Sequence, residues 1–315
     1  MQISARAPAA TIRSPWLPQV PGLVRALRLH QWTKNLLVFV PILLAGRLDE
    51  LPALITTVTA FVALGLIASG SYLINDVRDL PDDRAHWSKR HRPLASGQLS
   101  VGLAMLAAAL LIVAGLAAGA FISAATAGFL CLYLLLTLAY TFGLKRIPLL
   151  DGLVLATLFT LRLGIGIVAA EVRPSPWLLV FSMFMFTSLC YARRHAELAQ
   201  AVERGETEIA GRGYRTVDAP LVMALGVGAG LGATLIAVLY ILDDAFVQTF
   251  YGNKAALWAL PPVLFLFIAR IWIKCQRGEM REHPLDFALK DPAGLALGAA
   301  ALILFLLAWL GPAWL

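Results

Sequence analysis

The chain has 315 residues, of which 59% are hydrophobic and only 14% are charged, and its mean hydropathy is +0.76. A soluble domain carries about 45–50% apolar and about 25% charged residues, so a soluble enzyme, a secreted disulfide scaffold and a disordered chain are excluded. The net charge of +7 does not call for a nucleic-acid partner, because basic residues beside membrane spans are explained by topology. The period-two alternation of an outer-membrane barrel is absent. The composition therefore predicts an all-α, polytopic membrane protein.

The first 22 residues differ from the rest of the chain. They hold four prolines and no long apolar core, which is typical of neither a signal peptide nor a membrane span. We expect residues 1–22 to form a flexible cytoplasmic tail and residues 23–315 to form a single transmembrane domain.

Nine apolar blocks follow the tail, separated by short charged segments. Most are close to the ~20 residues that cross a bilayer, but the first is short and is expected to begin as an interfacial helix from Val24. The predicted spans are 35–46, 52–74, 101–120, 123–142, 150–170, 176–192, 219–242, 255–274 and 292–310.

The basic residues follow the alternation that nine spans impose. Of the 26 lysine and arginine residues, 21 fall on the side of the N-terminus, and Arg47, Arg173 and Lys254 fall on the other side. Only Arg162 and Arg270 lie inside spans. This asymmetry predicts an N-terminus in the cytoplasm. The long loops 75–100, 193–218 and 275–291 then face the cytoplasm, so we expect the chemistry at the cytoplasmic face of the plasma (inner) membrane.

An acidic motif closes the second predicted span. If the helix continues, Asp79 and Asp83 lie about 300° and 340° around it from Asp76, at about 100° per residue, so the three carboxylates share one face with Asn75 just before them. Carboxylates clustered in this way repel each other unless a cation lies between them. Oxygen ligands of this kind suit Mg²⁺, which commonly bridges to substrate phosphates.

A basic run follows the acidic motif. Arg84, Lys89, Arg90 and Arg92 are the kind of side chains that clamp phosphate oxygens. Acidic groups for a metal beside basic groups for a phosphate are typical of a diphosphate site. The alternative is a solvated loop whose charges only set topology, which the shared face and the adjoining basic run disfavour.

The fifth predicted span carries two charged residues. Asp151 begins it, and Arg162 follows eleven residues later, which is about 20° of rotation and ~16 Å of rise. Arg162 is therefore predicted on the same face, deep in the membrane, where a charge is costly and faces a polar interior or a partner. A structural ion pair is one interpretation, and a role in holding an anion is the one we favour.

The stretch from Asn75 to Asp83 matches NDxxDxxxD, and the chain therefore resembles the UbiA superfamily of intramembrane prenyltransferases. This resemblance implies a bundle of nine helices and a motif that binds Mg²⁺ and a prenyl diphosphate. Ordinary members carry a second, DxxxD motif near the start of the sixth helix. Here the candidate is Asp151, and its +4 position is the apolar Leu155, so the second pair of carboxylates is missing.

Four further segments resemble one branch of that superfamily, the decaprenyl-phosphate phosphoribosyltransferases and their bacterial relatives. Where members of that branch have Lys-Arg-Tyr-Ala-Glu, this chain has Arg193-Arg194-His195-Ala196-Glu197. The segments are LHQWTKN (29–35), HWSKRHRPLASG (86–97), RRHAEL (193–198) and RGEMREHPLDFALKD (277–291).

The branch implies a transfer of 5-phosphoribose from phosphoribosyl diphosphate to a polyprenyl (decaprenyl) phosphate, giving a lipid-linked precursor for the arabinan of cell-wall arabinogalactan. In that scheme the acidic motif and Mg²⁺ hold the donor diphosphate, and Lys89 and Arg92 neutralise the leaving group or the 5-phosphate. The metal ligands would be Asn75, Asp76, Asp79 and Asp83. The residues bordering the acceptor phosphate would be Tyr140, Lys145, Asp151 and Arg162, with Asp151 also contacting the donor ribose. The other phosphate-binding residues would be Lys34, Arg193 and Arg194.

Two alternatives stay open. A conventional member of the superfamily would move a prenyl group to an aromatic acceptor, and a protein of another class would be an ion-coupled transporter. The five histidines lack metal-ligand spacing, and Gly211-Arg212-Gly213-Tyr214 is predicted to be a flexible cytoplasmic loop. Homo-oligomerisation is left open.

Overall fold

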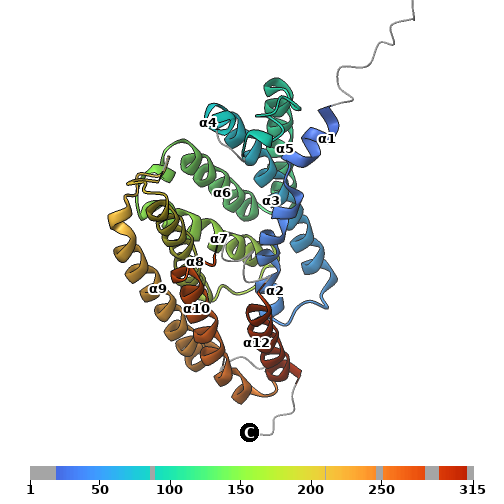
Figure 1. Cartoon of the computed structure of the whole chain (residues 1–315). Helices are drawn as coiled ribbons and strands as arrows, with labels where there is room; N and C mark the ends of the chain where they lie inside the picture. Colours follow the sequence, from blue (N-terminus) through green and yellow to red (C-terminus); the bar gives the residue numbers. More distant parts are fainter. Residues whose placement is uncertain (1–18, 86–88, 210, 246–250, 281–290, 311–315) are drawn as a thin grey trace, which may run out of the picture.

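The computed structural model describes residues 19–85, 89–209, 211–245, 251–280 and 291–310. These residues form a bundle of helices (Figure 1), and their one β-bridge joins Glu208 and Arg215. The α-helices are α1 (Val20–Ala26), α2 (Val40–Leu44), α3 (Leu51–Arg78), α4 (Leu80–Ala85), α5 (Val101–Ile122), α6 (Ala124–Phe142), α7 (Leu150–Ala169), α8 (Pro176–Glu203), α9 (Ala219–Tyr240), α10 (Leu260–Gln276) and α12 (Pro292–Leu310). The short or tighter turns are η2 (Leu29–Phe39), η3 (Lys89–His91), η4 (Leu144–Arg146), η5 (Thr216–Asp218), η6 (Ile241–Ala245) and η7 (Lys254–Ala259).

In the described part of the chain, seven helical segments are long and apolar enough to cross a membrane, which makes the chain a multi-pass integral membrane protein. Each coincides with a predicted span, because an unbroken apolar run of this length can satisfy its backbone in lipid only as a helix. The segments are Leu51–Arg78, Val101–Ile122, Ala124–Phe142, Leu150–Ala169, Thr216–Asp243, Lys254–Gln276 and Pro292–Leu310.

The first predicted span, 35–46, is not one continuous α-helix, and its crossing of the membrane stays a prediction. The chain runs as a 3₁₀ helix over Leu29–Phe39 and then as α2, although 3₁₀ runs longer than 3–4 residues are uncommon. Its backbone lies directly against α7, where a Cβ added at Gly166 would come within 2.1 Å of the carbonyl oxygen of Val38. The close approach of this segment to α7 therefore depends on the absence of a side chain at Gly166.

The sixth predicted span also differs, because α8 continues well past residue 192 to Glu203. Its last turns carry charged side chains, of which Arg194 is buried. The apolar run therefore ends before the helix does. The count of nine spans stays a prediction.

The described chain begins within the predicted tail, because α1 starts at Val20 while residues 1–18 lie outside the described residues. Ala26 is buried in a cluster with Leu73 and Leu94, so this short helix packs on the bundle.

Side-chain contacts define two ends of the bundle. At one end, Arg47 donates to the carbonyl oxygens of Ala170 and Glu171, each at 3.1 Å, and Trp177 donates to Asp243 at 2.8 Å. At the other, which we call the charged end, α3 ends and α7 begins, and Lys145 meets Asp79. The loops predicted on opposite sides of the membrane thus lie at opposite ends of the structure.

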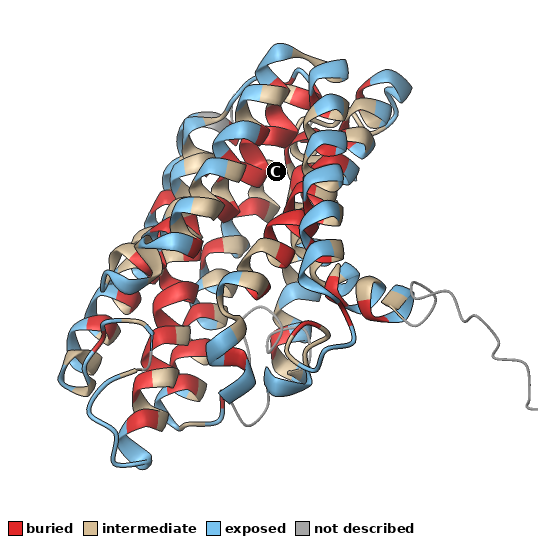
Figure 2. Cartoon of the chain, turned by 90° about the horizontal axis from the view of Figure 1, so that it is seen from above, coloured by how far each residue is buried: buried red, intermediate tan, exposed pale blue. Residues whose placement is uncertain are grey.

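Burial identifies α7 as the inner helix of the bundle. In an 18-residue apolar stretch of α7, 72% of the residues are buried, against 11% in the corresponding stretch of α12. Figure 2 shows buried residues on the inward faces of the helices and exposed residues outside. The two charged side chains of α7, Asp151 and Arg162, are therefore enclosed by other helices and do not face lipid.

Candidate functional site

The acidic motif lies at the charged end, across the junction of α3 and α4. The amide of Asp79 donates to the carbonyl oxygen of Asn75 at 2.9 Å, and that of Asp83 donates to Asp79 at 2.8 Å, so helical spacing continues through the junction. Asp76 and Asp83 are both 2% exposed. Both accept from Nη1 of Arg92, at 3.3 and 2.6 Å. The predicted shared face thus brings these two carboxylates to one cation.

Asp79 has different partners. Its carboxylate accepts from Nζ of Lys145 at 2.7 and 3.1 Å and from the side-chain Nδ2 of Asn75 at 3.2 Å. Lys145, which was predicted beside an acceptor phosphate, therefore meets the acidic motif and ties it to the segment before α7.

Arg28 is a cation of this cluster that the sequence analysis did not identify. Its Nη2 donates to Oδ1 of Asp76 at 2.5 Å, and its guanidinium lies 5.2 Å from the ring centre of Tyr72. Arg28 has a left-handed φ of 52°. It is 48 residues from Asp76, and no local pattern marks it among the other basic residues near the N-terminus.

The donor set of the acidic motif suits Mg²⁺ in kind. Among the described residues, no three Asp, Glu, His or Cys side chains are placed so that they could hold a metal ion by themselves. Mg²⁺, however, is usually bound through one or two carboxylates together with water and substrate phosphates. Asp76 and Asp83, which already converge on one positive charge, fit that role.

A second cluster surrounds Asp151, which is fully buried. Its carboxylate accepts from Nε of Arg194 at 2.5 Å, from the hydroxyl of Tyr214 at 2.6 Å and from the amide of Gly152 at 2.6 Å. Burial and then the hydrogen bond to Asp151 raise the pKa of the Tyr214 phenol. Tyr214 therefore stays protonated and acts as a hydrogen-bond donor to the carboxylate.

Glu197 is the acidic partner of Arg193 and Arg194 near the end of α8. It accepts from Nε of Arg193 at 3.0 Å and from Nη1 of Arg194. Burial favours its neutral form, but Arg194 and Arg193 outweigh burial and lower the pKa of Glu197. In the sequence, Glu197 follows the two arginines of RRHAEL. This pattern was a signal for a carboxylate of the site, which the sequence analysis did not use.

The segment from Gly211 to Tyr214 corrects the prediction of a flexible loop. Tyr214 is 0% exposed, and its hydroxyl accepts from the amide of Leu149 at 2.7 Å. A Cβ at Gly213, whose φ is +67°, would come within 2.3 Å of the carbonyl oxygen of Arg146. The loop is therefore packed onto the turn that begins α7.

Arg212 lies between the segment before α7 and Asp151. Its Nη1 donates to the hydroxyl of Tyr140 and lies 3.6 Å from Asp151. Residues 140–151 thus contact the acidic motif through Lys145 and the second cluster through Tyr140 and Asp151. The two clusters form one site at the charged end.

Arg162 does not reach Asp151, although the sequence predicted one face for both. It donates to Oδ1 of Asn35 at 3.1 Å, to the carbonyl oxygen of Leu158 at 2.6 Å and to the hydroxyl of Tyr133 at 3.1 Å. Within the described part of the chain these partners are all neutral, so the interpretation as a structural ion pair is wrong.

Two predicted phosphate-binding residues remain, Lys34 and Lys89. Lys34 donates to Gln31 at 2.7 Å, and Lys89 is exposed in η3. Parts of the segments 86–97 and 277–291 fall outside the described residues, as does His283.

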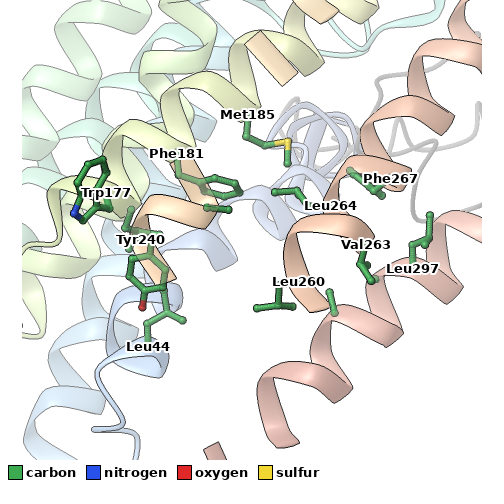
Figure 3. A pocket seen from close by; sticks show the side chains of 14 residues that line it. Leu44, Trp177, Phe181, Met185, Tyr240, Leu260, Val263, Leu264, Phe267 and Leu297 are labelled. Carbon is green, nitrogen blue, oxygen red and sulfur yellow. The ribbon is translucent and has the colours of Figure 1, made fainter. Parts of the chain in front are cut away.

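An apolar pocket of about 370 Å³ lies between α2, α8, α9, α10 and α12. Figure 3 shows aromatic and aliphatic side chains around it, among them Phe181, Met185, Tyr240 and Leu264. Met185 precedes Arg194 by nine residues on α8, which is about 14 Å of helix. The pocket is of a size that takes part of an apolar chain.

Comparisons with known proteins identify related chains. The model of the UbiA prenyltransferase family matches residues 36–290. A decaprenyl-phosphate phosphoribosyltransferase of Mycolicibacterium smegmatis is 33% identical over 302 residues, 93% of this chain and 91% of the relative. The nodulation protein NoeC of Azorhizobium caulinodans is 33% identical over 304 residues, 93% of this chain and 96% of the relative.

A third relative is longer. The uncharacterized protein y4nM of Sinorhizobium fredii is 39% identical over 282 residues, which are 90% of this chain but only 55% of that protein. The chain therefore spans about half the length of that relative.

Solved structures share the fold. A digeranylgeranylglyceryl phosphate synthase superposes with a TM-score of 0.66 at 14% identity, covering 92% of this chain and 98% of the other. A UbiA homolog from Archaeoglobus fulgidus bound to GPP and Mg²⁺ gives 0.65 at 14% identity, covering 90% and 96%.

Proposed function

The chain belongs to the UbiA prenyltransferase family, and we propose that it transfers 5-phosphoribose from phosphoribosyl diphosphate to a polyprenyl phosphate. As a member of that family it is a membrane transferase that uses polyprenyl substrates. The lipid-linked phosphoribose would serve as a precursor for cell-wall arabinan. The reaction is proposed to depend on Mg²⁺ and to take place at the cytoplasmic face of the plasma membrane. The mycobacterial relatives named decaprenyl-phosphate phosphoribosyltransferase support this choice of substrates.

The observation that carries the proposal is the number of cations around the five buried or half-buried acids at the charged end. The cations are Arg28, Arg92, Lys145, Arg193, Arg194 and Arg212. Phosphoribosyl diphosphate and a lipid phosphate together bring a diphosphate and two monoesters, and positive side chains are the groups that bind phosphate oxygens. A prenyl diphosphate with a neutral aromatic acceptor would need fewer cationic side chains.

The acidic motif is proposed to hold the donor diphosphate. Asp76 and Asp83 would bind Mg²⁺, with Asn75 and Asp79 beside them, and the ion would neutralise charge on the diphosphate. Arg28, Arg92 and Lys145, which now contact these carboxylates, reach the same place and can donate to phosphate oxygens. They would stabilise the departing pyrophosphate electrostatically.

The second cluster is proposed to hold the ribose and the acceptor. An oxygen of the lipid phosphate attacks C1 of the ribose, the bond from C1 to the diphosphate oxygen breaks, and pyrophosphate leaves with inversion at C1. A phosphate monoester is already anionic at pH 7, so no general base is required. Arg193, Arg194 and Arg212 would orient the phosphates, and Asp151 would accept from a ribose hydroxyl.

The apolar pocket offers a place for part of the acceptor chain. Its lining from Leu44, Phe181 and Leu264 has no charged group, as a polyprenyl tail requires. The tail is thereby proposed to lie along α8 while its phosphate points to the charged end.

The proposal is tested with detergent-purified protein, Mg²⁺ and labelled phosphoribosyl diphosphate, with polyprenyl phosphate added or withheld. Label should enter the organic phase only with both metal and lipid phosphate. No transfer from phosphoribosyl diphosphate, together with turnover of a prenyl diphosphate and an aromatic acceptor, would assign the chain to conventional prenyl transfer.

Asp76→Asn removes a carboxylate on which Arg28 and Arg92 converge. We expect transfer to fall by about 10²-fold or more, as when a group that stabilises charge in the transition state is lost. Asp82→Asn is the matched control, because Asp82 is an exposed acid of the short helix α4, directly beside the buried Asp83. Equal activity of the two variants would exclude the metal-binding role.

A further inference from the structure

The buried charge of Arg162 has no acidic counterpart among the described residues. Arg162 lies on the inner helix α7 and is 5% exposed. A guanidinium stays charged at any physiological pH, and burying a charge is costly unless a charge of opposite sign accompanies it. Its three hydrogen bonds go to an amide, a carbonyl and a hydroxyl oxygen. The fold thus keeps a positive charge that its own described side chains do not neutralise.

The amide of Asn35 adds a second group in need of a partner. Asn35 is 2% exposed, and its Nδ2 is buried without a hydrogen-bond acceptor among the described residues. Its Oδ1 accepts from Nε of Arg162, so turning the amide over would only set two donors against each other. The orphaned donor therefore belongs to the same cluster as the uncompensated charge.

These groups leave several N–H donors without acceptors at one place. A guanidinium has five N–H groups, of which three donate to protein, and Nδ2 of Asn35 has two more. The rings of Tyr133 and Phe159 lie 5.1 and 4.9 Å from the guanidinium. An anion with several oxygens, such as a phosphate monoester, would satisfy both the charge and the donors.

The position of the cluster indicates how such an anion would arrive. Arg162 follows Leu150, the first residue of α7, by twelve residues, or about 18 Å of helix. The cluster therefore lies away from the charged end, further along α7 and among apolar helices. A soluble ion would have to leave water to reach it. The phosphate of a lipid must leave water as well, but its attached chain gains free energy from the apolar surroundings, which offsets part of that cost.

We propose that Asn35 and Arg162 form a second anion-binding site, which takes the phosphate monoester of a polyprenyl lipid. The choice of lipid rests on the proposed function, whereas the requirement for an anion does not. The site lies beneath the donor site and would receive the acceptor before its phosphate reaches the charged end.

Asn35→Asp tests this site directly, because it places a carboxylate of the same shape beside Nε of Arg162. The Tm of purified protein is measured with farnesyl phosphate, with farnesol and with inorganic phosphate. Wild type should be stabilised by farnesyl phosphate alone. The variant should have a Tm higher by about 2 °C or more without ligand, and should lose the response because its own carboxylate neutralises Arg162.

Asn253→Asp is the matched control, since Asn253 caps η7 at the other end of the bundle and aspartate caps equally well. It should change neither the Tm nor the response. Arg162→Gln provides a second reading and should abolish the response to farnesyl phosphate.

A lower Tm for Asn35→Asp with the lipid response retained would overturn the site. Equal stabilisation of wild type by inorganic phosphate would overturn its assignment to a lipid. The proposed transfer fails separately, if wild type responds to farnesyl phosphate yet transfers no label from phosphoribosyl diphosphate.

Discussion

Leu149 is a residue whose backbone conformation must be held in place by its neighbours. It has a φ of 65°, which is uncommon for a residue with a bulky side chain. Tyr214 accepts from its amide at 2.7 Å, and Tyr191 donates to its carbonyl oxygen at 3.1 Å. Because Asp151 follows two residues later and also binds Tyr214, the same tyrosine fixes both the turn and the carboxylate.

Tyr214→Phe should therefore destabilise the protein and lower transfer. The buried amide of Leu149 loses its acceptor, and a buried group left unsatisfied costs about 1–3 kcal/mol. Adding Leu149→Gly should recover part of the lost Tm, because glycine adopts positive φ without strain. The Tm and the transfer rate of both variants are the measurements. An unchanged Tm for Tyr214→Phe would contradict the role of this tyrosine.

At the scale of elements, Asp291 connects α10 to α12. Its carboxylate accepts from Nε and Nη2 of Arg270 at 2.5 and 2.7 Å and from the amide of Gly294 at 2.7 Å. The hydrogen bond from Arg270 and then the amide of Gly294 lower the pKa of Asp291 to about 2, below the ordinary value of about 3.9. Arg270, predicted inside a span, thus serves as an anchor for the start of the last helix.

This pair predicts a pH dependence of stability. Because the pKa of Asp291 is lowered on folding, its stabilisation is present above pH ~4 and is lost as the pH falls toward about 2. Asp291→Asn keeps a capping oxygen but loses the charge, and should lower the Tm by about 1–2 °C at pH 7. The difference from wild type should shrink at pH 3. A constant difference between pH 7 and pH 3 would contradict the ion pair.

The packing of η2 on α7 gives another prediction at this scale. Gly166→Ala would set a methyl group against the backbone of Val38, at 2.1 Å from its carbonyl oxygen, and should cost about 1–3 kcal/mol through overpacking. Gly128→Ala is the matched control, because nothing lies within 4 Å of a Cβ there, and alanine favours the helix. Denaturation of both variants should show opposite changes in Tm, and a neutral Gly166→Ala would argue against the close contact.

For the whole molecule, the two ends of the bundle must correspond to the two sides of the membrane. Five predicted spans, the last of them α8, separate Asp49 from Glu206, so these two residues face opposite sides if α8 crosses. Asp49→Cys should be labelled by an impermeant maleimide in intact spheroplasts, and Glu206→Cys only in inverted vesicles. Glu171→Cys should match Asp49→Cys, since Arg47 joins those loops. Labelling of Asp49→Cys and Glu206→Cys from one side would refute the count of nine.

Local sequence determined the class of the protein and the acidic half of its site. Hydropathy marked the spans because a helix in lipid must be apolar over about 20 residues, and the spacing of Asp76 and Asp83 placed both on one face because a helix repeats every 3.6 residues. These signals are carried by neighbouring residues, so the chain order alone was sufficient.

Only the tertiary structure decided which charges meet. Arg28 contacts Asp76 across 48 residues, and Tyr214 contacts Asp151 across 63. Such contacts depend on how helices pack side by side, which no local period records. The same packing places Arg162 against Asn35, which is 127 residues away in the sequence, and not against an acid on its own helix. It also packs Gly211–Tyr214 onto the turn before α7.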